Sequence, residues 1–459
     1  MARVNRHDFF LQCRERFPYF EFTRQEWSVN EHGLDIRYTF SLAGQYTFKP
    51  TLFIPAGLSV SFPGLAGTAL DNIVFQIGMI ELISYWKAAC PPRVIVRPFA
   101  LRPEQADWWR RLYFHGLGEF LYLNSIDVRE EDLMTIECIS DQYPGIVRPE
   151  LDEGILVPVG GGKDSAVTLE ILRKHATCYP LIVNPRGASL ETVLAAGFKR
   201  EEIIEISRTL DPMLLQLNDQ GFLNGHTPFS ALLAFVTALS ALVSGHRHIA
   251  LSNESSANEA TIEGTDINHQ YSKSFRFESD FREYSRRWIC GELDYFSFLR
   301  PLNELQIAGL FAKMPQYHPV FRSCNAGSKT DSWCGRCAKC LFTYTILSPF
   351  IRDEELVQIF GADLFADESL VPVLDQLAGI AAGKPFDCVG TLDEVNLALC
   401  EAIRQRDGLR LPALLAYYKG SMAYQRYFRE NFRNGLVSIS TEHHLDARLE
   451  GWLKSAIEG

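Results

Sequence analysis

The sequence predicts an α/β protein with a central parallel sheet, a mixed α/β region before that sheet and a helical region after it. Between residues 151 and 345, short apolar runs alternate with helical patterns, which is typical of right-handed βαβ units. Residues 1–150 mix strand and helix patterns, and residues 346–459 have mostly helical patterns. The length of 459 residues fits roughly three domains of about 150 residues each. We therefore expect domains at 1–150, 151–345 and 346–459.

The N-terminal region carries strand and helix signals but no motif of known chemistry. Alternation of apolar with polar residues predicts strands at 36–40 and 46–48. The apolar segment 73–86 is expected to be a helix, and a short strand is expected at 94–96. We assign this region to substrate binding, because the motifs described below place the remaining chemistry elsewhere in the chain.

The elements of the later regions are predicted from apolar runs and from helix-start signals. Thr227 and Pro228 have the residue types of an N-cap and a first helical position. In the C-terminal region, Thr391 and Glu394 have the spacing of a capping box. A helix is expected at 166–172. Strands are expected in the short apolar runs 155–159, 179–183, 203–206 and 248–252.

The composition excludes several classes of protein. Hydrophobic residues make up 47% and charged residues 22% of the chain, which is incompatible with intrinsic disorder. The net charge is −11, whereas proteins that grip polyanions are usually basic, so no nucleic-acid partner is expected. The longest apolar stretch, 229–243, is too short to span a bilayer comfortably. With no export signal and cysteines too sparse for a secreted disulfide scaffold, we expect a cytoplasmic protein of undetermined oligomeric state.

The most informative segment is a glycine loop between a predicted strand and a predicted helix. Gly160, Gly161 and Gly162 allow a tight turn in which consecutive N–H groups point to one spot and bind an anion. The following helix adds its positive N-terminal dipole. In the same loop Lys163 can neutralise charge, Asp164 can hold Mg²⁺ and Ser165 can donate a hydroxyl to a phosphate oxygen.

This loop is not a Walker loop, because the Gly-Lys-Ser/Thr ending after a four-residue spacer is missing. It resembles the Ser-Gly-Gly-x-Asp-Ser signature of the PP-loop ATP pyrophosphatases, with Gly160 in the place of the serine. The resemblance implies a PP-loop (adenine-nucleotide alpha hydrolase-like) fold and an enzyme that cleaves ATP to AMP and pyrophosphate while adenylating a substrate. The alternative is a glycine-rich turn without a ligand.

A cluster of four cysteines predicts a metal site. Cys324, Cys334, Cys337 and Cys340 supply the four thiolates that a closed tetrahedral zinc site needs, with Zn–S distances of about 2.3 Å. Such a structural zinc would hold the loop 324–340 against the sheet. An iron–sulfur cluster, a redox disulfide and four free thiols are the competing interpretations.

A dense run of polar residues follows the last strand that we expect. Ligands of open α/β sheets bind beyond the carboxyl ends of the strands, so Asn253, Glu254, Asn258 and Glu259 are predicted to contact the substrate. The segment 268–274 is equally rich in hydrogen-bonding groups. The alternative is a solvated loop. His226 could reach a phosphate, and a plain capping-region histidine is the competing interpretation.

Taken together, these segments resemble one particular family, the ATP-dependent UDP-N-acetylmuramoyl-L-alanyl-L-glutamate epimerases of bacterial cell-wall synthesis. The resemblance implies that ATP and Mg²⁺ are required, that AMP and pyrophosphate are products, and that the terminal L-Glu of a small UDP-linked muramoyl dipeptide is inverted to D-Glu in peptidoglycan precursor synthesis. It covers most of the chain from about residue 150 onward. The segments that carry it are 159–165, 253–259, 268–277, 333–340 and 384–390.

The implied chemistry needs acid/base groups near neutrality on each face of the inverted carbon. His269, Tyr271 and Lys273 are our candidates, with Glu254 and Glu259 in reserve, and Lys163 and Asp164 act at the phosphates. Three rival functions remain open: a 7-cyano-7-deazaguanine synthase-like enzyme, a tRNA thiolase or lysidine synthetase, and a non-catalytic nucleotide-binding scaffold. The long regions before the loop and after the cysteines argue against the first, and the acidic charge argues against the second.

Overall fold

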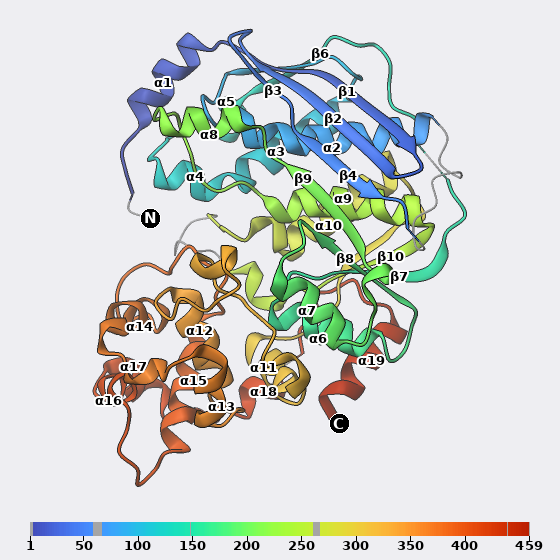
Figure 1. Ribbon diagram of the computed structural model, residues 1–459. Helices are drawn as coiled ribbons and strands as arrows, with labels where there is room; N and C mark the ends of the chain where they lie inside the picture. Colours follow the sequence, from blue (N-terminus) through green and yellow to red (C-terminus); the bar gives the residue numbers. More distant parts are fainter. Residues whose placement is uncertain (1–2, 58–66, 147, 260–266, 438, 459) are drawn as a thin grey trace.

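The computed structural model describes residues 3–57, 67–146, 148–259, 267–437 and 439–458. These residues form an α/β fold around one eleven-stranded, mostly parallel sheet, in the order β11-β10-β7-β8-β9-β4-β2-β1-β5-β6, with β3 paired to β2 (Figure 1). The predicted α/β class is therefore confirmed. Helices cover both faces of this sheet and extend beyond it at the C-terminal end of the chain.

The parallel half of the sheet contains the four strands predicted for the central region and a fifth strand, β11, that was not predicted. In sequence order its strands are arranged 3-2-1-4-5, and all neighbours among them are parallel. The first and fourth strands, β7 and β10, lie side by side, so the winding direction reverses between them. The strands are β7 (Asp152–Pro158), β8 (Cys178–Val183), β9 (Ile204–Thr209), β10 (His246–Leu251) and β11 (Asp294–Ser297).

Alternate side chains of β7 enter two different cores. Ile155 and Val157 belong to the core that contains α6, whereas Leu156 belongs to the core that contains α9. Burial on both faces explains why the strand is a continuous apolar run. The connecting helices are α6 (Lys163–Leu172), α7 (Gly187–Ala195), α8 (Pro212–Asp219), α9 (Phe229–Ser244) and α10 (Phe275–Trp288).

The start of α9 differs from the prediction by one residue. The N-cap is Pro228 rather than Thr227, and the helix begins at Phe229. Pro228 has a ψ of 74°, outside the helical range, and no side chain caps this helix. The expected position of the N-cap was therefore wrong, although Pro228 does mark the helix start.

The N-terminal half extends the same sheet. Strand β4 pairs antiparallel with β9, Phe53 lying opposite Ser207, so the sheet continues across the domain boundary expected near residue 150. Helix α2 packs against β1, β2 and α9. The strands are β1 (Phe20–Asn30), β2 (Gly33–Leu42), β3 (Tyr46–Phe48), β4 (Thr51–Pro55), β5 (Arg93–Val96) and β6 (Thr135–Cys138). The helices are α1 (His7–Arg16), α2 (Thr68–Trp86), α3 (Pro103–Gly116), α4 (Gly118–Leu123) and α5 (Glu130–Leu133).

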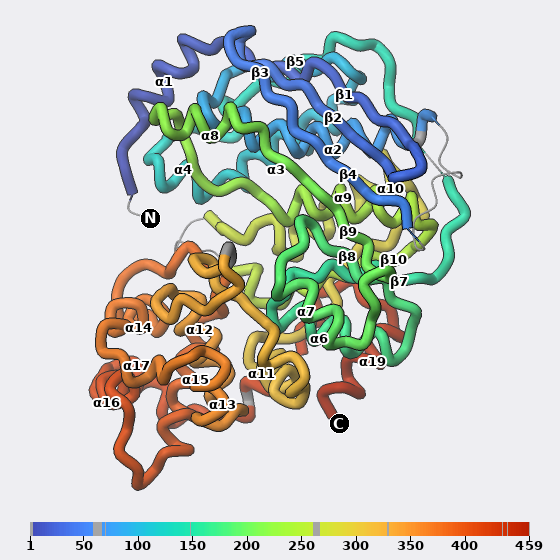
Figure 2. The backbone as a smooth tube through the Cα atoms, in the orientation of Figure 1, coloured from blue at the N-terminus to red at the C-terminus, as the bar shows by residue number. Residues whose placement is uncertain are grey.

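The C-terminal region is helical, as predicted, and lies at the lower left of Figure 2, with the N-terminal strands at the top. The capping box of α15 is confirmed, since Thr391 accepts from the backbone N–H of Glu394. None of the described helices is long and apolar enough to cross a membrane. The helices are α11 (Glu304–Ala312), α12 (Ala338–Leu347), α13 (Asp353–Phe360), α14 (Val371–Leu377), α15 (Leu392–Arg404), α16 (Ala413–Lys419), α17 (Met422–Tyr427), α18 (Asn434–Val437) and α19 (Ala447–Glu458).

Candidate active site

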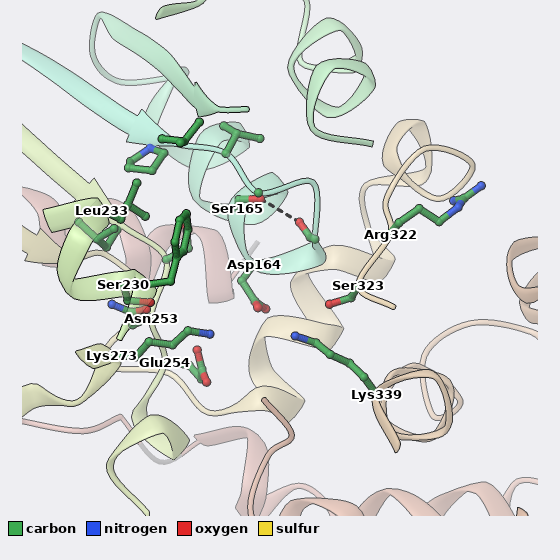
Figure 3. Close-up of a pocket in the computed structure, with 18 of the residues that line it drawn as sticks. Asp164, Ser165, Ser230, Leu233, Asn253, Glu254, Lys273, Arg322, Ser323 and Lys339 are labelled. Carbon is green, nitrogen blue, oxygen red and sulfur yellow. Dashed lines mark hydrogen bonds between the residues drawn. The ribbon is translucent and has the colours of Figure 1, made fainter. Parts of the chain in front are cut away.

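A cavity of about 390 Å³ opens at the carboxyl ends of β7 and β10, the point where the winding of the sheet reverses. Open α/β sheets bind their ligands at such a point. We name it the switch-point cavity, and Figure 3 shows it. It is lined by Pro158, Val159, Gly160, Gly162, Asp164, Ser165, Leu181, Val183, Phe229, Ser230, Leu233, Leu251, Ser252, Asn253, Glu254, Lys273, Arg322, Ser323, Cys324, Asn325 and Lys339.

The glycine loop follows β7 and opens α6, the strand–turn–helix context that its sequence predicts. Gly161 has a φ of +87°, and a Cβ there would lie 2.8 Å from the backbone of Ala188 and Ser189. Only glycine fits this position without strain. Gly162 is the N-cap residue of α6, and Ser165 Oγ donates to its carbonyl oxygen at 3.1 Å. The loop thus presents the N-terminus of a ten-residue helix to the cavity.

Lys163 lies outside this lining. Its side chain is 4% exposed and forms ion pairs with Asp164 and Glu304. Burial by itself lowers the pKa of Lys163, but the two carboxylates outweigh it and raise the pKa above the usual value. Lys163 therefore positions the carboxylates of Asp164 and Glu304. The expectation was that its charge would neutralise a phosphate.

Three carboxylates converge beside the glycine loop. Asp164, Glu254 and Glu304 each offer an oxygen within 4.8 Å of the others. Burial and the neighbouring carboxylates of Asp164 and Glu254 together raise the pKa of Glu304 to about 8, against the lowering effect of Lys163. Crowded negative charge of this kind attracts a cation, and an all-oxygen donor set fits Mg²⁺.

Glu304 is a site residue that sequence reasoning missed. It is the first residue of α11 and comes 140 positions after Asp164. The only local signal is the capping box formed by Asn303 and Gln306, which predicts a helix start but not a function.

The other side chains that line the cavity are cationic at one end and apolar at the other. The ammonium groups of Lys273 and Lys339 point toward Asp164 from two sides in Figure 3, and Ser323 lies on the same side as Lys339. The apolar end is formed by the ends of β8 and β10 and by the first turns of α9, and it offers surface for a flat aromatic ring such as adenine. These apolar lining residues are Leu181, Val183, Phe229, Leu233 and Leu251.

The predicted acid/base residues separate into two groups. Lys273 Nζ donates to Cys388 Sγ at 3.1 Å, and His269 Nε2 lies 3.7 Å from the same sulfur. Burial lowers the pKa of His269 to about 3, helped by His226 and Lys273. Tyr271 instead turns away, 7% exposed, with its ring 5.0 Å from that of His115. Cys388 is the second residue that sequence reasoning did not select.

The neighbours of Lys273 favour its positively charged form. Burial lowers the pKa of Lys273, but Cys388 and Glu254 outweigh this effect and raise the pKa. His226 lies farther out, where burial lowers its pKa to about 4, and its Nδ1 is 3.7 Å from Glu119. His226 is adjacent to His269, with ring centroids 5.6 Å apart.

The predicted substrate contacts after β10 also separate. Asn253 and Glu254 line the switch-point cavity, and Asn253 Nδ2 donates to Ser297 Oγ at 3.0 Å. Asn258 accepts from the backbone N–H of Phe275 at 2.7 Å, and Glu259 pairs with Lys384. Neither Asn258 nor Glu259 belongs to the described lining, so both act here as local supports.

Arg300 holds the two active-site loops together. Its side chain is fully buried and forms an ion pair with Glu278 at 3.0 Å. The same guanidinium donates to the backbone carbonyl oxygens of Glu254 and Lys273. One buried side chain therefore fixes the backbone of two residues that line the cavity.

The four cysteines form one compact group at the edge of the cavity. Their sulfur atoms lie within 4.8 Å of one another, with Sγ–Sγ distances of 3.8 Å for Cys324–Cys337, 3.7 Å for Cys334–Cys340 and 3.5 Å for Cys337–Cys340. A tetrahedral zinc with Zn–S bonds of about 2.3 Å needs sulfurs about 3.8 Å apart, whereas a disulfide needs about 2.05 Å. The donor set therefore fits a zinc ion.

The fold and the cavity define an α/β protein whose site joins a glycine loop to clustered carboxylates and lysines. Comparison with known proteins shows to which family the chain belongs. Residues 11–298 match the model of the MurL N-terminal domain, and residues 320–425 match the model of the MurL C-terminal domain. The chain belongs to the MurL family and is an enzyme of the epimerase class.

Three curated relatives extend the comparison. The chain is 33% identical to a protein of Xanthomonas oryzae over 83% of both chains. It is 33% identical to a protein of Micromonospora over 82% of this chain and 86% of the relative. A Salinispora tropica protein is 32% identical over 78% of both chains. All three bear the name UDP-N-acetyl-alpha-D-muramoyl-L-alanyl-L-glutamate epimerase.

Proposed function

We propose that this enzyme inverts the terminal L-Glu of UDP-N-acetylmuramoyl-L-alanyl-L-glutamate to D-Glu at the expense of ATP, which it cleaves to AMP and pyrophosphate. The names of its relatives support the substrate. The observation that carries the use of ATP is the meeting of the glycine loop, three carboxylates and two lysines in one cavity. We further propose that the parallel half has the PP-loop type of fold, which the loop motif and the strand order support.

Activation by ATP makes it easier to remove the Cα proton of the terminal glutamate. The Cα proton of a residue with a free carboxylate is hard to remove, because the carbanion forms beside an existing negative charge. Transfer of AMP to that carboxylate neutralises it and creates an electron-poor mixed anhydride. The enolate that forms on deprotonation is then stabilised by nearby positive groups. Reprotonation on the opposite face inverts the carbon, and water releases AMP.

The residues of the cavity suit these tasks. The glycine loop and the N-terminus of α6 offer N–H donors to a phosphate. Lys273 and Lys339 offer positive charge to the phosphates and to the developing enolate oxygen. The apolar residues at the end of β8 and the start of α9 offer a surface for adenine.

Two metals fit the residues present. Asp164, Glu254 and Glu304 would hold Mg²⁺, which supplies charge neutralisation at the phosphates when bound. The four cysteines would hold a structural zinc beside the cavity wall. Because ATP and nucleotide-linked precursors are cytoplasmic compounds, we expect the enzyme to act in the cytoplasm.

The proposal is tested by incubating the protein with ATP, Mg²⁺ and the L-Glu-terminated precursor. We expect pyrophosphate release that depends on the precursor, and D-Glu in the chiral analysis of the hydrolysed product. An Asp164→Asn variant is the control, and with it we expect neither pyrophosphate release nor D-Glu in the product. Pyrophosphate release only with a deazaguanine carboxylate or with tRNA would instead support the rival enzymes. The absence of pyrophosphate release with any of these substrates would support a scaffold.

A further inference from the structure

We propose that Cys388 is a catalytic residue, the group that exchanges the Cα proton of the substrate on one face of the inverted carbon. The inference rests on the proposed function and adds a named base to it. Cys388 precedes α15 by four residues and borders the switch-point cavity through Lys273, which belongs to the cavity lining.

The position of the sulfur relative to the cavity carries the inference. Lys273 Nζ points into the cavity and also donates to Cys388 Sγ at 3.1 Å (Figure 3). An acyl phosphate held by Lys273 places its carbonyl carbon beside this ammonium, and Cα is the next atom along the chain. The inference requires Cα to approach Sγ to about 3–3.5 Å, the distance that reacting atoms need, and the contact of Sγ with Lys273 Nζ places the sulfur next to this position.

Distances also show which groups can share one face. Two groups on opposite faces of a carbon, each about 3–3.5 Å from it, are about 6–7 Å apart. Lys273 Nζ and His269 Nε2 lie only 3.1 and 3.7 Å from Cys388 Sγ. Each of these two groups is therefore too close to the sulfur to act on the face opposite to it, so Cys388 cannot share the two proton transfers with Lys273 or with His269, and we treat the three side chains as one unit.

Within this unit the sulfur is best suited to take the proton. Lys273 carries a positive charge and has no free electron pair, so its task is to stabilise the enolate. Burial, and after it the nearby cationic groups of Lys273, Lys339 and Lys384, lower the pKa of His269 to about 3, so this imidazole is a poor proton acceptor. The sulfur of Cys388 receives a hydrogen bond from the ammonium group of Lys273, the kind of contact that activates a cysteine.

The inversion consists of a proton removal on one face and a proton delivery on the other. The thiolate sulfur forms an S–H bond with the Cα proton, and the electron pair of the broken C–H bond moves into the C–C bond and onto the carbonyl oxygen as an enolate. A Brønsted acid on the opposite face, from the protein or from water, then delivers a proton. The enolate pair becomes the new C–H bond, and the thiol returns its proton to solvent.

The test compares Cys388→Ala and Cys388→Ser with the unaltered protein in D₂O. Three quantities are followed with ATP and the L-Glu-terminated precursor: pyrophosphate release, deuterium at Cα and chirality of the glutamate. We expect pyrophosphate release within about 3-fold of normal, because adenylation does not need the sulfur. Deuterium incorporation and inversion should fall by about 100-fold or more, the usual contribution of a positioned base. Cys138→Ala, a change to a free cysteine outside the cavity lining, is the matched control.

The outcomes separate the inference from the proposed function. If the variants invert glutamate within about 3-fold of normal, Cys388 is not the base. If the folded variants lose pyrophosphate release as well, Cys388 acts in binding or adenylation, and the inference is again overturned. If the unaltered protein neither releases pyrophosphate nor inverts the precursor, the proposed function fails together with the inference. The serine variant keeps the size of the side chain, so a packing defect in the alanine variant alone is recognised.

Discussion

Gly160 and Gly161 are neighbours in the glycine loop, yet the structure constrains them differently. A Cβ on Gly160 would meet no atom within 4 Å. A Cβ on Gly161 would lie 2.8 Å from the backbone of Ala188 and Ser189, and the φ of +87° adds strain for any L side chain. Gly160 also stands where the related signature has serine, so only Gly161 is required by the local geometry.

This contrast predicts different outcomes for two matched variants. Gly161→Ala should lose pyrophosphate release by at least about 100-fold, because the loop must shift by several tenths of an ångström and its N–H groups lose their alignment. Gly160→Ala should stay within about 3-fold of normal. Both rates are measured with ATP and the precursor. Equal losses in the two variants would contradict the geometry of the loop.

Glu304 is the residue whose role depends most on its surroundings. It meets Asp164 and Glu254 only in the folded protein. We predict that Glu304→Gln raises the Mg²⁺ concentration needed for half-maximal pyrophosphate release by about 10–100-fold, since one ligand loses its charge. Glu283→Gln, on the exposed face of α10, is the control and should leave the Mg²⁺ dependence unchanged. Unaltered Mg²⁺ dependence in the Glu304 variant would remove this residue from the metal site.

At the scale of elements, Arg300 connects the end of β11 to the loop after β10 and to the segment before α10. It binds Glu278 and the carbonyl oxygens of Glu254 and Lys273. Because the guanidinium is fully buried, its removal leaves the buried carboxylate of Glu278 without a positively charged partner, and only the backbone N–H of Ser297 still donates to it.

We predict that Arg300→Met lowers the free energy of unfolding by about 3–5 kcal/mol, the usual effect of breaking a buried ion pair. The double variant Arg300→Met with Glu278→Gln should recover part of this loss, because the unpaired charge is removed as well. Chemical denaturation measures both. Additive losses in the double variant would show that the two side chains act independently.

The elements themselves were largely predictable, and their partners were not. Apolar runs marked β7, β8, β9 and β10 within a few residues, because burial on both faces demands continuous apolar sequence. The antiparallel pairing of β4 with β9 could not be predicted. Strand pairing depends on long-range packing, and no local pattern in either strand names its partner.

At the scale of the whole molecule, the cysteine cluster connects the helical region to the cavity. Ser323, Cys324 and Asn325 line the cavity at one end of the clustered segment, and Lys339 lines it next to Cys340. Asn325 also donates to Asp387, the neighbour of Cys388. A metal bound to these four cysteines would therefore fix one wall of the cavity.

We predict that zinc removal lowers both stability and activity. Elemental analysis of protein purified without chelator should give about one zinc per chain. A zinc-specific chelator in excess Mg²⁺ should lower the melting temperature and slow pyrophosphate release, and added zinc should reverse both effects, since metal binding is coupled to folding. A protein without metal that has full activity, or one with an iron-based chromophore, would contradict this assignment.

The sequence by itself determined the α/β class, four of the five strands of the parallel half (β7, β8, β9 and β10), the helix after the glycine loop, the loop at 160–165 and the four cysteines. These features depend on residues that are close in the chain, so local patterns of burial, turn geometry and spacing reveal them. Only the tertiary structure decided that Glu304 joins Asp164, that Lys163 pairs with Glu304, and that Cys388 meets Lys273. These contacts join residues more than a hundred positions apart, or depend on the direction of one side chain. Packing of the complete chain sets these long-range contacts and side-chain directions, and no local sequence pattern indicates them.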